Sequence, residues 1–172
     1  TPLHGWNAVA KRAFDLVFAV TVLMALSPLY ALRAAAVRLT SSGPVLYRQD
    51  RMGLDGQSFR MLKFRTMKVG AEAESGPVWA RAGDARRTAI GAFLRRFSLD
   101  ELPQFVNVLR GEMSVVGPRP ERPVFVERFR QTVPGYMLRH KVKSGVTGWA
   151  QINGLRGNTS LERRIEYDIQ YI

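Results

Sequence analysis

LVFAVTVLMALSPLYALRAAAV, at residues 16–37, is an apolar stretch near the start of this 172-residue chain. As one straight helix its 22 residues would be about 33 Å long, enough to cross the hydrocarbon core of a bilayer. Pro28 interrupts the stretch, because proline lacks a backbone donor and clashes with the preceding helical turn. Arg33 follows too soon for a second half to reach the far side without burying a charge. The stretch therefore predicts a bent helix rather than a simple span.

Basic residues flank the stretch on both sides. Lys11 and Arg12 precede it, and Arg38 follows it. Because positive charge favours the cytoplasmic face of a membrane, both ends are expected to stay on that side. The pattern predicts a re-entrant membrane hairpin within residues 1–40, which enters one leaflet and returns.

The bend itself predicts a role for Ser27 and Pro28 as the break in the membrane helix. A carbonyl freed at the bend needs a donor inside the membrane, and the Ser27 hydroxyl can supply it. Two other interpretations fit the same residues. One is a secretory signal peptide, with Lys11-Arg12 as its basic region and residues 34–36 as the small residues of a cleavage site. The other is a buried helix of a soluble core.

The composition excludes several kinds of chemistry. Lys and Arg number 26 against 14 acidic residues, a formal net charge of +12. Such an excess favours an anionic partner: nucleic acid, an anionic lipid surface or a phosphorylated substrate. There are no cysteines, which excludes disulfides, thiolate zinc sites and cysteine nucleophiles. With two histidines a His-rich metal site is not expected, so the chemistry should use carboxylates, arginines, lysines and hydroxyls.

Residues 41–172 show no repeats and no interdomain linker, which indicates one small domain. Residues 44–50 and 57–67 predict two strands, and the Asp55-Gly56 turn between them predicts a β-hairpin. Such a hairpin would gather four cations: Arg48, Arg51, Lys63 and Arg65.

The rest of this domain is expected to be mostly helical. The predicted helices cover residues 84–97, 99–110, 121–131 and 136–143, with Gly111 ending the second. Residues 159–162 have the spacing of a capping box that opens a last helix. Residues 71–83 and the glycine-rich residues 144–154 are expected to be irregular. The fold class is therefore α+β: a re-entrant membrane hairpin plus a small, mostly helical domain with a β-hairpin and amphipathic surface helices.

The best candidate for chemistry is the pair Asp100-Glu101, within SLDELPQ at residues 98–104. Carboxylates at a helix start are stabilised by the positive end of the helix dipole. Ser98 and Glu101 also have capping-box spacing, so ordinary helix capping is one explanation. Pro103 favours a helix that begins just after the pair, which would leave both acids on an exposed turn, available for chemistry. The spacing alone leaves both interpretations open.

Several cations lie around this pair in the sequence. Arg95 precedes it, Arg119 lies in the stiff Pro-Arg-Pro loop, and Lys63 and Arg65 can approach from the hairpin. Arginine binds phosphate oxygens in a bidentate manner, and Mg²⁺ bridges carboxylates and diphosphates. Two acids among many cations suggest a phosphate site with a divalent metal, although the cations also fit an ordinary basic surface.

Three sequence blocks point to a family. They are KFRTM at residues 63–67, LRRFSLDELPQFVNVLRGEMSVVGPRP at 94–120 and GVTGWAQING at 145–154. Together with Lys11-Arg12 and Ser27-Pro28, they resemble the bacterial sugar transferases called monotopic phosphoglycosyl transferases. Within that family the closest type is the catalytic domain of polyprenyl-phosphate hexose-1-phosphate transferases. The resemblance covers nearly the whole chain, and it implies that the apolar segment is a re-entrant helix kept in the mature enzyme.

The resemblance also implies a reaction. A UDP-sugar donates its sugar 1-phosphate to Asp100 and releases UMP, and polyprenyl (undecaprenyl) phosphate then accepts the phosphosugar. Glu101, together with Asp100, would hold Mg²⁺. An anion that attacks another anion needs neutralising charge. The expected substrate-binding residues are Lys63, Arg65, Arg95, Arg119 and Gln151.

Location and partners follow from the same resemblance. The protein is expected on the cytoplasmic face of the bacterial inner membrane, at the first membrane step of polysaccharide or glycoconjugate assembly. It is expected to bind no nucleic acid, and a homodimer is one arrangement to test. Family members continue past Ile172 and some carry transmembrane helices in front, so residues 41–172 are expected to be a catalytic domain shortened at its C-terminus. Residues 153–159 resemble members that transfer glucose or galactose 1-phosphate.

Two rival functions remain at this stage. One is a basic, membrane-attached module that binds nucleic acid or anionic lipid, which explains the charge but gives no reason for Asp100-Glu101. The other is a single-step transferase in which Asp100 is only a metal ligand.

Overall fold

The computed structural model describes residues 5–73, 76, 78, 84–157 and 159–172. It opens with two helices, α1 (Trp6–Ala25) and α2 (Ser27–Thr40), which are bent by 63° at Leu26. The predicted break is confirmed: Pro28 lies in the first turn of α2, where its missing donor costs nothing. The Ser27 hydroxyl donates to the carbonyl of Met24 at 2.9 Å.

The two helices are covered on one side only. Asp15 and Ala19 of α1 and Arg33 and Val37 of α2 are buried against the rest of the molecule. The opposite side exposes large apolar residues, among them Val9, Phe14, Val17, Met24, Leu32 and Leu39. In the described ranges no single helix is long and apolar enough to cross a membrane, whereas the bent pair qualifies by length and composition alone.

The basic pair in α1 anchors this helix to the domain. The Lys11 ammonium donates to Asp15 at 2.6 Å, and Asp15 also accepts from the backbone nitrogen of Val115 at 3.0 Å. The Arg12 guanidinium donates to the carbonyls of Val108 and Leu109 at 2.6 and 2.9 Å. Those carbonyls belong to the last turn of a helix, where a cation is favourable.

The β-hairpin consists of β1 (Leu46–Met52) and β2 (Ser58–Phe64), paired antiparallel. The predicted Asp-Gly turn is confirmed by positive φ angles of 50° at Asp55 and 76° at Gly56, within the short 3₁₀ turn η1 (Leu54–Gly56). Strand β1 is shifted by two residues relative to the predicted range 44–50, and β2 is shorter than the predicted range 57–67. Differences of this size are usual at element ends.

Helix α3 (Ala89–Arg96) begins five residues later than predicted. Met67 forms an isolated antiparallel bridge with Arg87, and Thr88 donates its backbone hydrogen to the carbonyl of Thr66 at 3.0 Å. Residues 85 and 86 form a turn and Arg87 pairs with Met67, so the helix starts only after Thr88, which caps it by accepting from the backbone nitrogen of Gly91. A Cβ at Gly91 would lie 2.1 Å from the Thr66 carbonyl oxygen, so only glycine fits there.

The segment that holds Asp100-Glu101 is a short 3₁₀ turn, η2 (Leu99–Glu101), followed by α4 (Gln104–Arg110). The expected single helix over 99–110 is thus split in two, and Pro103 separates its parts. The predicted end at Gly111 is confirmed, since this residue has a left-handed φ of 83°.

The C-terminal part contains more regular structure than predicted. Strands β3 (Ser114–Val116) and β4 (Gly145–Thr147) pair in parallel, and α6 (Trp149–Ile152) follows, so the expectation that 144–154 is irregular was wrong. The remaining elements are α5 (Pro123–Thr132), η3 (Tyr136–Lys141) and α7 (Leu161–Tyr171). The last helix is capped by Ser160, which accepts from the backbone nitrogen of Arg163, one residue after the predicted cap. Part of the predicted loop 71–83 lies outside the described residues.

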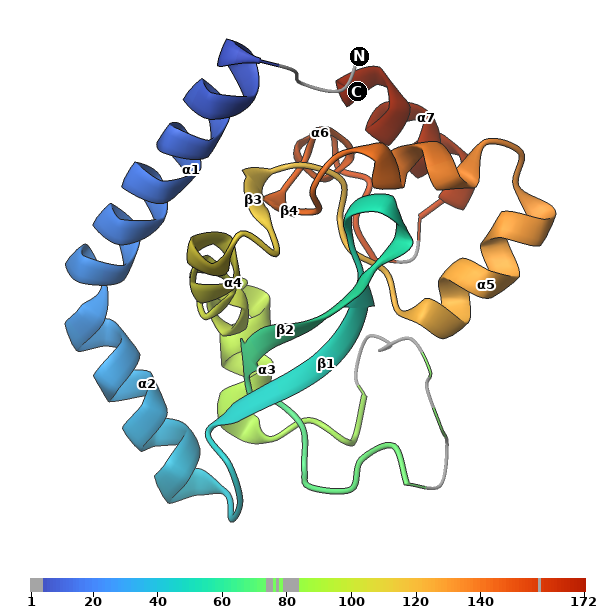
Figure 1. Cartoon of the computed structure of the whole chain (residues 1–172). Helices are drawn as coiled ribbons and strands as arrows, with labels where there is room; N and C mark the ends of the chain where they lie inside the picture. Colours follow the sequence, from blue (N-terminus) through green and yellow to red (C-terminus); the bar gives the residue numbers. More distant parts are fainter. Residues whose placement is uncertain (1–4, 74–75, 77, 79–83, 158) are drawn as a thin grey trace.

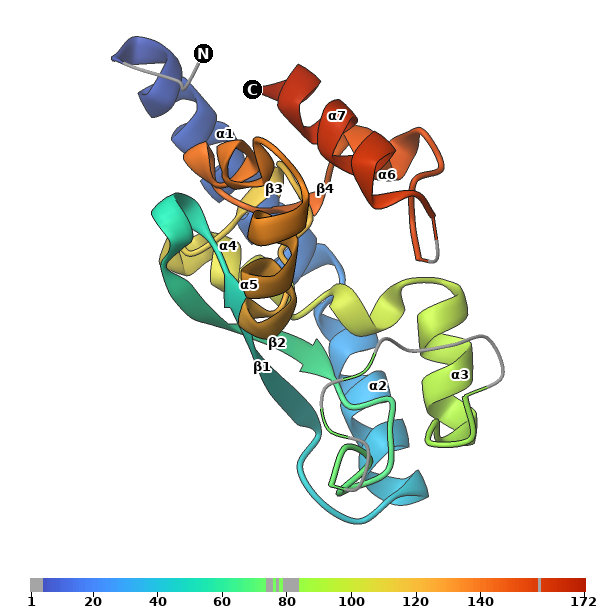
Figure 2. The same cartoon turned by 90° about the vertical axis from the view of Figure 1, so that its right-hand side faces the viewer.

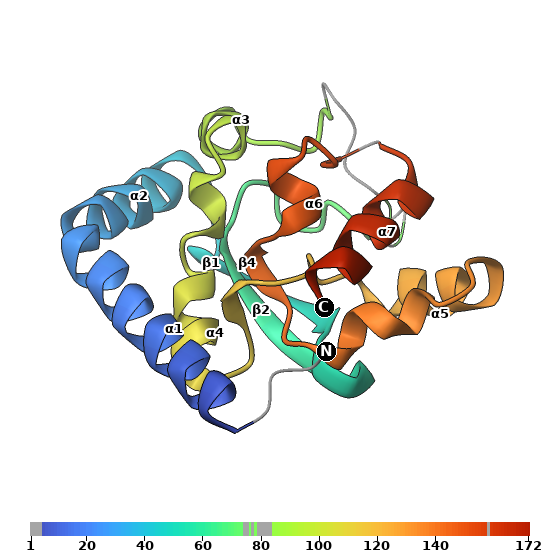
Figure 3. The same cartoon turned by 90° about the horizontal axis from the view of Figure 1, so that it is seen from above.

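Three clusters of buried side chains form the core. One joins α1, β2, α4 and β3 through residues such as Ala19, Met61, Val108 and Val115. A second joins α2, β2 and α3, and a third joins α5, η3 and α7. Figures 1 and 3 show the bent arm of α1 and α2 along one side, with α4 next to α1 and α3 next to α2. Figure 2 shows α6 and α7 together at the opposite end from α3. The α+β class is confirmed, and the two N-terminal helices share their cores with the rest of the chain.

Candidate functional site

Asp100 and Glu101 lie on the η2 turn, and the structure contradicts both simple expectations for them. Ser98 has a left-handed backbone (φ 55°) and makes no side-chain capping bond, so the capping-box interpretation was wrong. Asp100 is only 5% exposed, so the turn does not stand out in solvent. The neighbouring Leu99 and Leu102 explain this burial, because they pack into the second and first core clusters respectively.

Glu101 is held by two cations. Its carboxylate accepts from the Lys63 ammonium at 3.2 Å, and both carboxylate oxygens accept from the Arg119 guanidinium, one of them at 3.1 Å. Burial opposes ionisation of Glu101, but Arg119 and Lys63 outweigh it and hold the pKa well below its usual range. Burial also lowers the pKa of Lys63 to about 8, although Glu101 favours its charged form. Glu101 is therefore a fixed anion.

The loop that carries Arg119 is clamped by two other arginines. The Arg139 guanidinium donates to the Arg119 carbonyl at 2.9 Å and forms a buried ion pair with Asp168 at 2.6 Å. The Arg51 guanidinium donates to the carbonyl of Pro120 at 3.0 Å. The backbone of the loop that carries Arg119 is therefore held by η3, whose Arg139 is paired with α7, and by the hairpin.

Asp100 faces a cavity of about 320 Å³. The cavity is lined by five cations, two acids and two small residues: Arg51, Lys63, Arg95, Arg119, Arg156, Asp100, Glu101, Ser98 and Gly157. Asp100 forms no ion pair with any residue in the described part of the chain, unlike Glu101. Burial raises the pKa of Asp100, with Glu101 adding to the effect, while Lys63 and Arg95 oppose it. A largely buried carboxylate among cations, with its oxygens not held in an ion pair, is suited to nucleophilic attack.

Not all of the predicted site residues meet here. Lys63, Arg95 and Arg119 line the cavity with the two acids. Arg65 does not: its buried guanidinium donates to the carbonyls of Ser41 and Ser42 at 2.8 and 2.6 Å and holds the turn after α2.

Gln151 also lies outside the cavity lining. It is buried, and its amide donates to the carbonyl of Val146 at 3.5 Å. Two cations of the cavity, Arg51 and Arg156, were not among the predicted site residues. Arg51 shares a strand face with Lys63, which the hairpin pattern indicated, whereas Arg156 had no signal beyond its place in a glycine-rich segment.

A second cavity of about 480 Å³ adjoins the first, with Arg51, Lys63 and Arg95 lining both. Its further walls include apolar residues such as Tyr47, Phe64 and Met67. The charged centre around Asp100 thus continues into a mostly apolar space.

A model of the family described as "Bacterial sugar transferase" matches residues 6–172. The chain belongs to this family. Among its relatives is the UDP-glucose:undecaprenyl-phosphate glucose-1-phosphate transferase of Escherichia coli (strain K12), 53% identical over an alignment 176 positions long that covers 100% of this chain and 38% of the relative. The enzyme of the same name from Xanthomonas campestris pv. campestris is 48% identical over 168 residues, covering 95% of this chain and 35% of the relative.

A further relative transfers a different sugar by name. It is the UDP-N-acetylgalactosamine-undecaprenyl-phosphate N-acetylgalactosaminephosphotransferase of Aeromonas hydrophila, 42% identical over 167 residues, which are 96% of this chain and 39% of the relative. The chain therefore spans less than two-fifths of the length of these relatives.

A divalent metal is implied by the resemblance to bacterial sugar transferases. Among the residues that the structure places, no group of three or more acidic or histidine side chains could hold a metal ion. Mg²⁺, however, commonly takes one or two carboxylates and completes its shell with water and substrate phosphates. Asp100 and Glu101 supply that donor set at the cavity. Because Arg119 already occupies both oxygens of Glu101, the oxygens of Asp100 are the more accessible ligands.

Proposed function

We propose that this chain is the catalytic part of an enzyme that transfers a sugar 1-phosphate from a UDP-sugar to polyprenyl phosphate through a covalent intermediate on Asp100. The observation that carries the proposal is the geometry of the Asp-Glu turn. Asp100 is buried in a cavity lined by five cations, and the adjacent Glu101 is fully engaged by Lys63 and Arg119. The undecaprenyl-phosphate sugar transferases related to this chain supply the substrate class.

In the first step an oxygen of Asp100 attacks the phosphorus that bears the sugar. A new oxygen–phosphorus bond forms, the bond from that phosphorus to the bridging oxygen breaks, and UMP leaves with the bonding electron pair. In the second step an oxygen of polyprenyl phosphate attacks the same phosphorus, and the Asp100 carboxylate leaves. The product is a polyprenyl diphosphate-sugar, and neither step needs a proton.

The cations of the cavity have separate roles in these steps. Arg119 and Lys63 fix Glu101, so their charge is partly neutralised before substrate arrives. Arg156 forms no ion pair within the described residues and faces the same cavity, so its charge is free for the diphosphate. Arg95 is oriented by Thr66, whose hydroxyl accepts from its Nε at 2.9 Å. Mg²⁺ held by Asp100 and Glu101 would neutralise the diphosphate oxygens when bound.

The exposed apolar side of α1 and α2 supports a membrane location for the reaction. A bent pair of helices with apolar residues on its free side fits a hairpin that enters one leaflet from the cytoplasmic face of the bacterial inner membrane. Asp100 would then lie near the water–lipid boundary, where a soluble UDP-sugar and the head group of polyprenyl phosphate can both reach it.

This topology can be tested by labelling, because the chain has no cysteine of its own. Trp6→Cys and Ser41→Cys place a thiol at either end of the helix pair. Both should react with a membrane-impermeant maleimide in inverted membrane vesicles and stay unlabelled in intact spheroplasts. Labelling of the two positions from opposite sides would contradict the hairpin.

The covalent step is tested by intact mass spectrometry of the detergent-solubilised protein. Incubation with UDP-glucose alone should add one hexose phosphate to the protein and release UMP. Asp100→Asn should show neither the adduct nor turnover, whereas Asp55→Asn, an exposed carboxylate on the hairpin turn, should behave as wild type. Turnover without any adduct would instead support single-step transfer. Absence of turnover combined with steeply salt-dependent nucleic-acid binding would favour a binding module.

The identity of the transferred sugar is the most specific part of the proposal. The relatives named for glucose agree with the hexose 1-phosphate expected from residues 153–159, whereas another relative is named for N-acetylgalactosamine. We assign a hexose 1-phosphate. A panel of UDP-glucose, UDP-galactose and UDP-N-acetylgalactosamine in the same adduct assay should favour the first two.

A further inference from the structure

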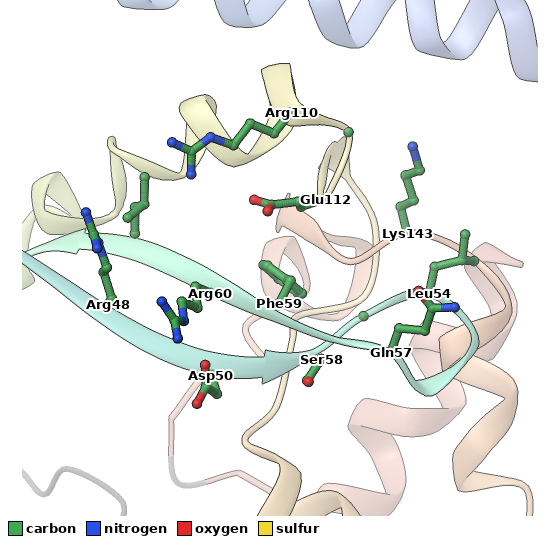
Figure 4. Close-up of a pocket in the computed structure, with 13 residues that line it drawn as sticks. Arg48, Asp50, Leu54, Gln57, Ser58, Phe59, Arg60, Arg110, Glu112 and Lys143 are labelled. Carbon is green, nitrogen blue, oxygen red and sulfur yellow. The ribbon is translucent and has the colours of Figure 1, made fainter.

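A larger cavity lies on the other face of the β-hairpin. Its volume is about 840 Å³, and it is bounded by β1, β2, the end of α4 and the segment after η3 (Figure 4). Side chains of successive strand residues point to opposite faces of a sheet. Arg48 and Arg60 therefore point away from the face that carries Arg51 and Lys63. No residue that lines the Asp100 cavity lines this one.

Four cations converge on this larger cavity. Arg48 and Arg60 come from the hairpin, Arg110 from the end of α4, and Lys143 from the segment before β4. Figure 4 shows the Arg110 side chain extended above the hairpin, with Arg60 below it. Within the part of the chain that the structure describes, none of the four forms an ion pair or a side-chain hydrogen bond, in contrast to Arg119 on the other face. Their mutual repulsion is not offset by pairing inside the chain.

Two carboxylates also line the cavity, but they do not balance it. Glu112 accepts from the amide of Asn107 at 2.6 Å. Asn107 is itself fixed between the backbone of Leu62 and that of Arg60, at 3.0 and 2.9 Å. Asp50 lies opposite Arg60 in the strand register and contributes a single charge. Positive charge therefore remains in excess.

Lys143 is the most crowded of the four cations. Burial, and the nearby Arg12 and Lys11, lower its pKa, while Asp15 opposes the effect. Gly111 lies between the two basic side chains: a Cβ there would be 3.7 Å from Lys143 Nζ and 3.6 Å from Arg12 Nη2. A bound anion would stabilise the charged form of Lys143, because it would offset the repulsion between this ammonium group and the nearby Arg12 and Lys11.

We propose that this cavity is a second anion site, which binds a phosphate group and is independent of the Asp100 centre. Guanidinium groups bind phosphate oxygens in a bidentate manner. Three arginines and one lysine supply many donors, which suits a phosphate group better than a carboxylate, because a phosphate has more acceptor oxygens. Two sources can provide the group. One is the head group of an anionic phospholipid, because Arg12 connects the rim of the cavity to α1. The other is a soluble diphosphate.

Amine-labelling kinetics of Lys143, read by peptide mass spectrometry, test the proposal at the cavity itself. The protein is placed in nanodiscs of phosphatidylcholine, with or without pyrophosphate, and in nanodiscs that contain phosphatidylglycerol. Labelling of Lys143 should slow several-fold with pyrophosphate, with phosphatidylglycerol or with both, and the pattern identifies the source. Lys141, which is exposed and lines neither this cavity nor the two cavities beside Asp100, should label at an unchanged rate.

Paired variants separate the site from general charge effects. Arg60→Gln with Arg110→Gln removes two exposed cavity arginines and should abolish the protection of Lys143. Arg128→Gln with Arg163→Gln removes the same charge from exposed positions on α5 and α7 and should leave the protection intact. The proposal is overturned if neither ligand slows the labelling of Lys143, or if protection survives in the cavity variant. Because the readout is local to Lys143, pyrophosphate bound at the Asp100 cavity does not affect the result.

Discussion

Alkaline pH should abolish the proposed transferase activity by removing the positive charge of Lys63. Burial lowers the pKa of this lysine to about 8, and below that value its ammonium pairs with Glu101 at 3.2 Å. With a pKa of about 8, roughly half of the protein carries the charge at pH 8 and about one tenth at pH 9. If the charge is needed to hold Glu101 and the diphosphate, kcat/KM should fall about tenfold for each further pH unit.

The acid side of the same profile depends on Asp100. Burial raises the pKa of Asp100, so this carboxylate should become protonated at a higher pH than an ordinary aspartate. In the proposed mechanism only the ionised form attacks phosphorus, so activity should fall as the pH drops through this raised pKa. Glu101 should not contribute to this limb, because Arg119 and Lys63 hold its pKa well below the usual range despite its burial.

The assay is UMP release at low UDP-sugar concentration, measured from about pH 5 to about pH 10. Because kcat/KM reports groups of the free enzyme, the bound diphosphate does not shift the value that is read. Lys63→Arg keeps a positive charge throughout this range and should lose the alkaline limb, even if its rate at neutral pH is reduced. Lys141→Arg is the matched control, since Lys141 is exposed and pairs with the exposed Asp55 at 3.3 Å.

Two results would refute the reasoning. One is a wild-type profile that stays flat through pH 9. The other is an active Lys63→Arg variant with the same alkaline limb as the wild type, because the limb would then belong to another group.

Three stability predictions follow from buried contacts. Asp168→Asn leaves the buried Arg139 guanidinium without its carboxylate and should lower the free energy of unfolding by about 3–5 kcal/mol in chemical denaturation. Tyr30→Phe removes the 2.5 Å hydrogen bond to the Leu102 carbonyl and should cost about 1 kcal/mol in the same assay. Gly91→Ala would place a methyl group 2.1 Å from a backbone carbonyl oxygen and should lower the thermal midpoint, whereas an unchanged midpoint would show that the turn can move.

Local signals in the sequence predicted the parts of the fold that are decided locally. The Pro28 bend, the Asp55-Gly56 turn and the helix end at Gly111 each depend on the conformational limits of one or two residues. Such limits act on the chain wherever it lies, so they can be inferred without knowledge of its neighbours.

The errors lie where distant segments meet. The start of α3 is delayed because Met67 pairs with Arg87, and no local pattern indicates that bridge. Residues 144–154 contain many glycines, which suggested an irregular loop. In the fold, Gly145 allows close backbone approach to Gly117, since a Cβ would lie 2.1 Å from the Gly117 nitrogen. Glycine there serves a parallel strand contact rather than a flexible loop.

The candidate site was predicted only in part for the same reason, because contacts between distant segments determine its shape. The sequence indicated Asp100-Glu101 as the place for chemistry, but not the burial of Asp100, which depends on Leu99 and Leu102 entering two different clusters. Nor could the sequence separate Arg65, which holds backbone carbonyls, from Arg156, which lines the cavity. A guanidinium is equally suited to either role, and only the fold decides what it meets.

The net charge of +12 also depends on the fold for its meaning, because the fold decides which cations are paired. Taken alone it suggests a diffuse basic surface, yet many of its cations have assigned partners: Arg12 caps α4, and Arg139 pairs with Asp168. Glu101 forms ion pairs with two more cations at the Asp100 cavity, Lys63 and Arg119. Among the described residues, several cations without an ion pair lie in two places, beside Asp100 and on the opposite face of the hairpin, and both are concave. Because an anion bound in a cavity is desolvated on several sides, these cations act more strongly there than on an open surface. The charge excess is therefore better explained by recognition of phosphate groups at defined positions than by general attraction to a polyanion.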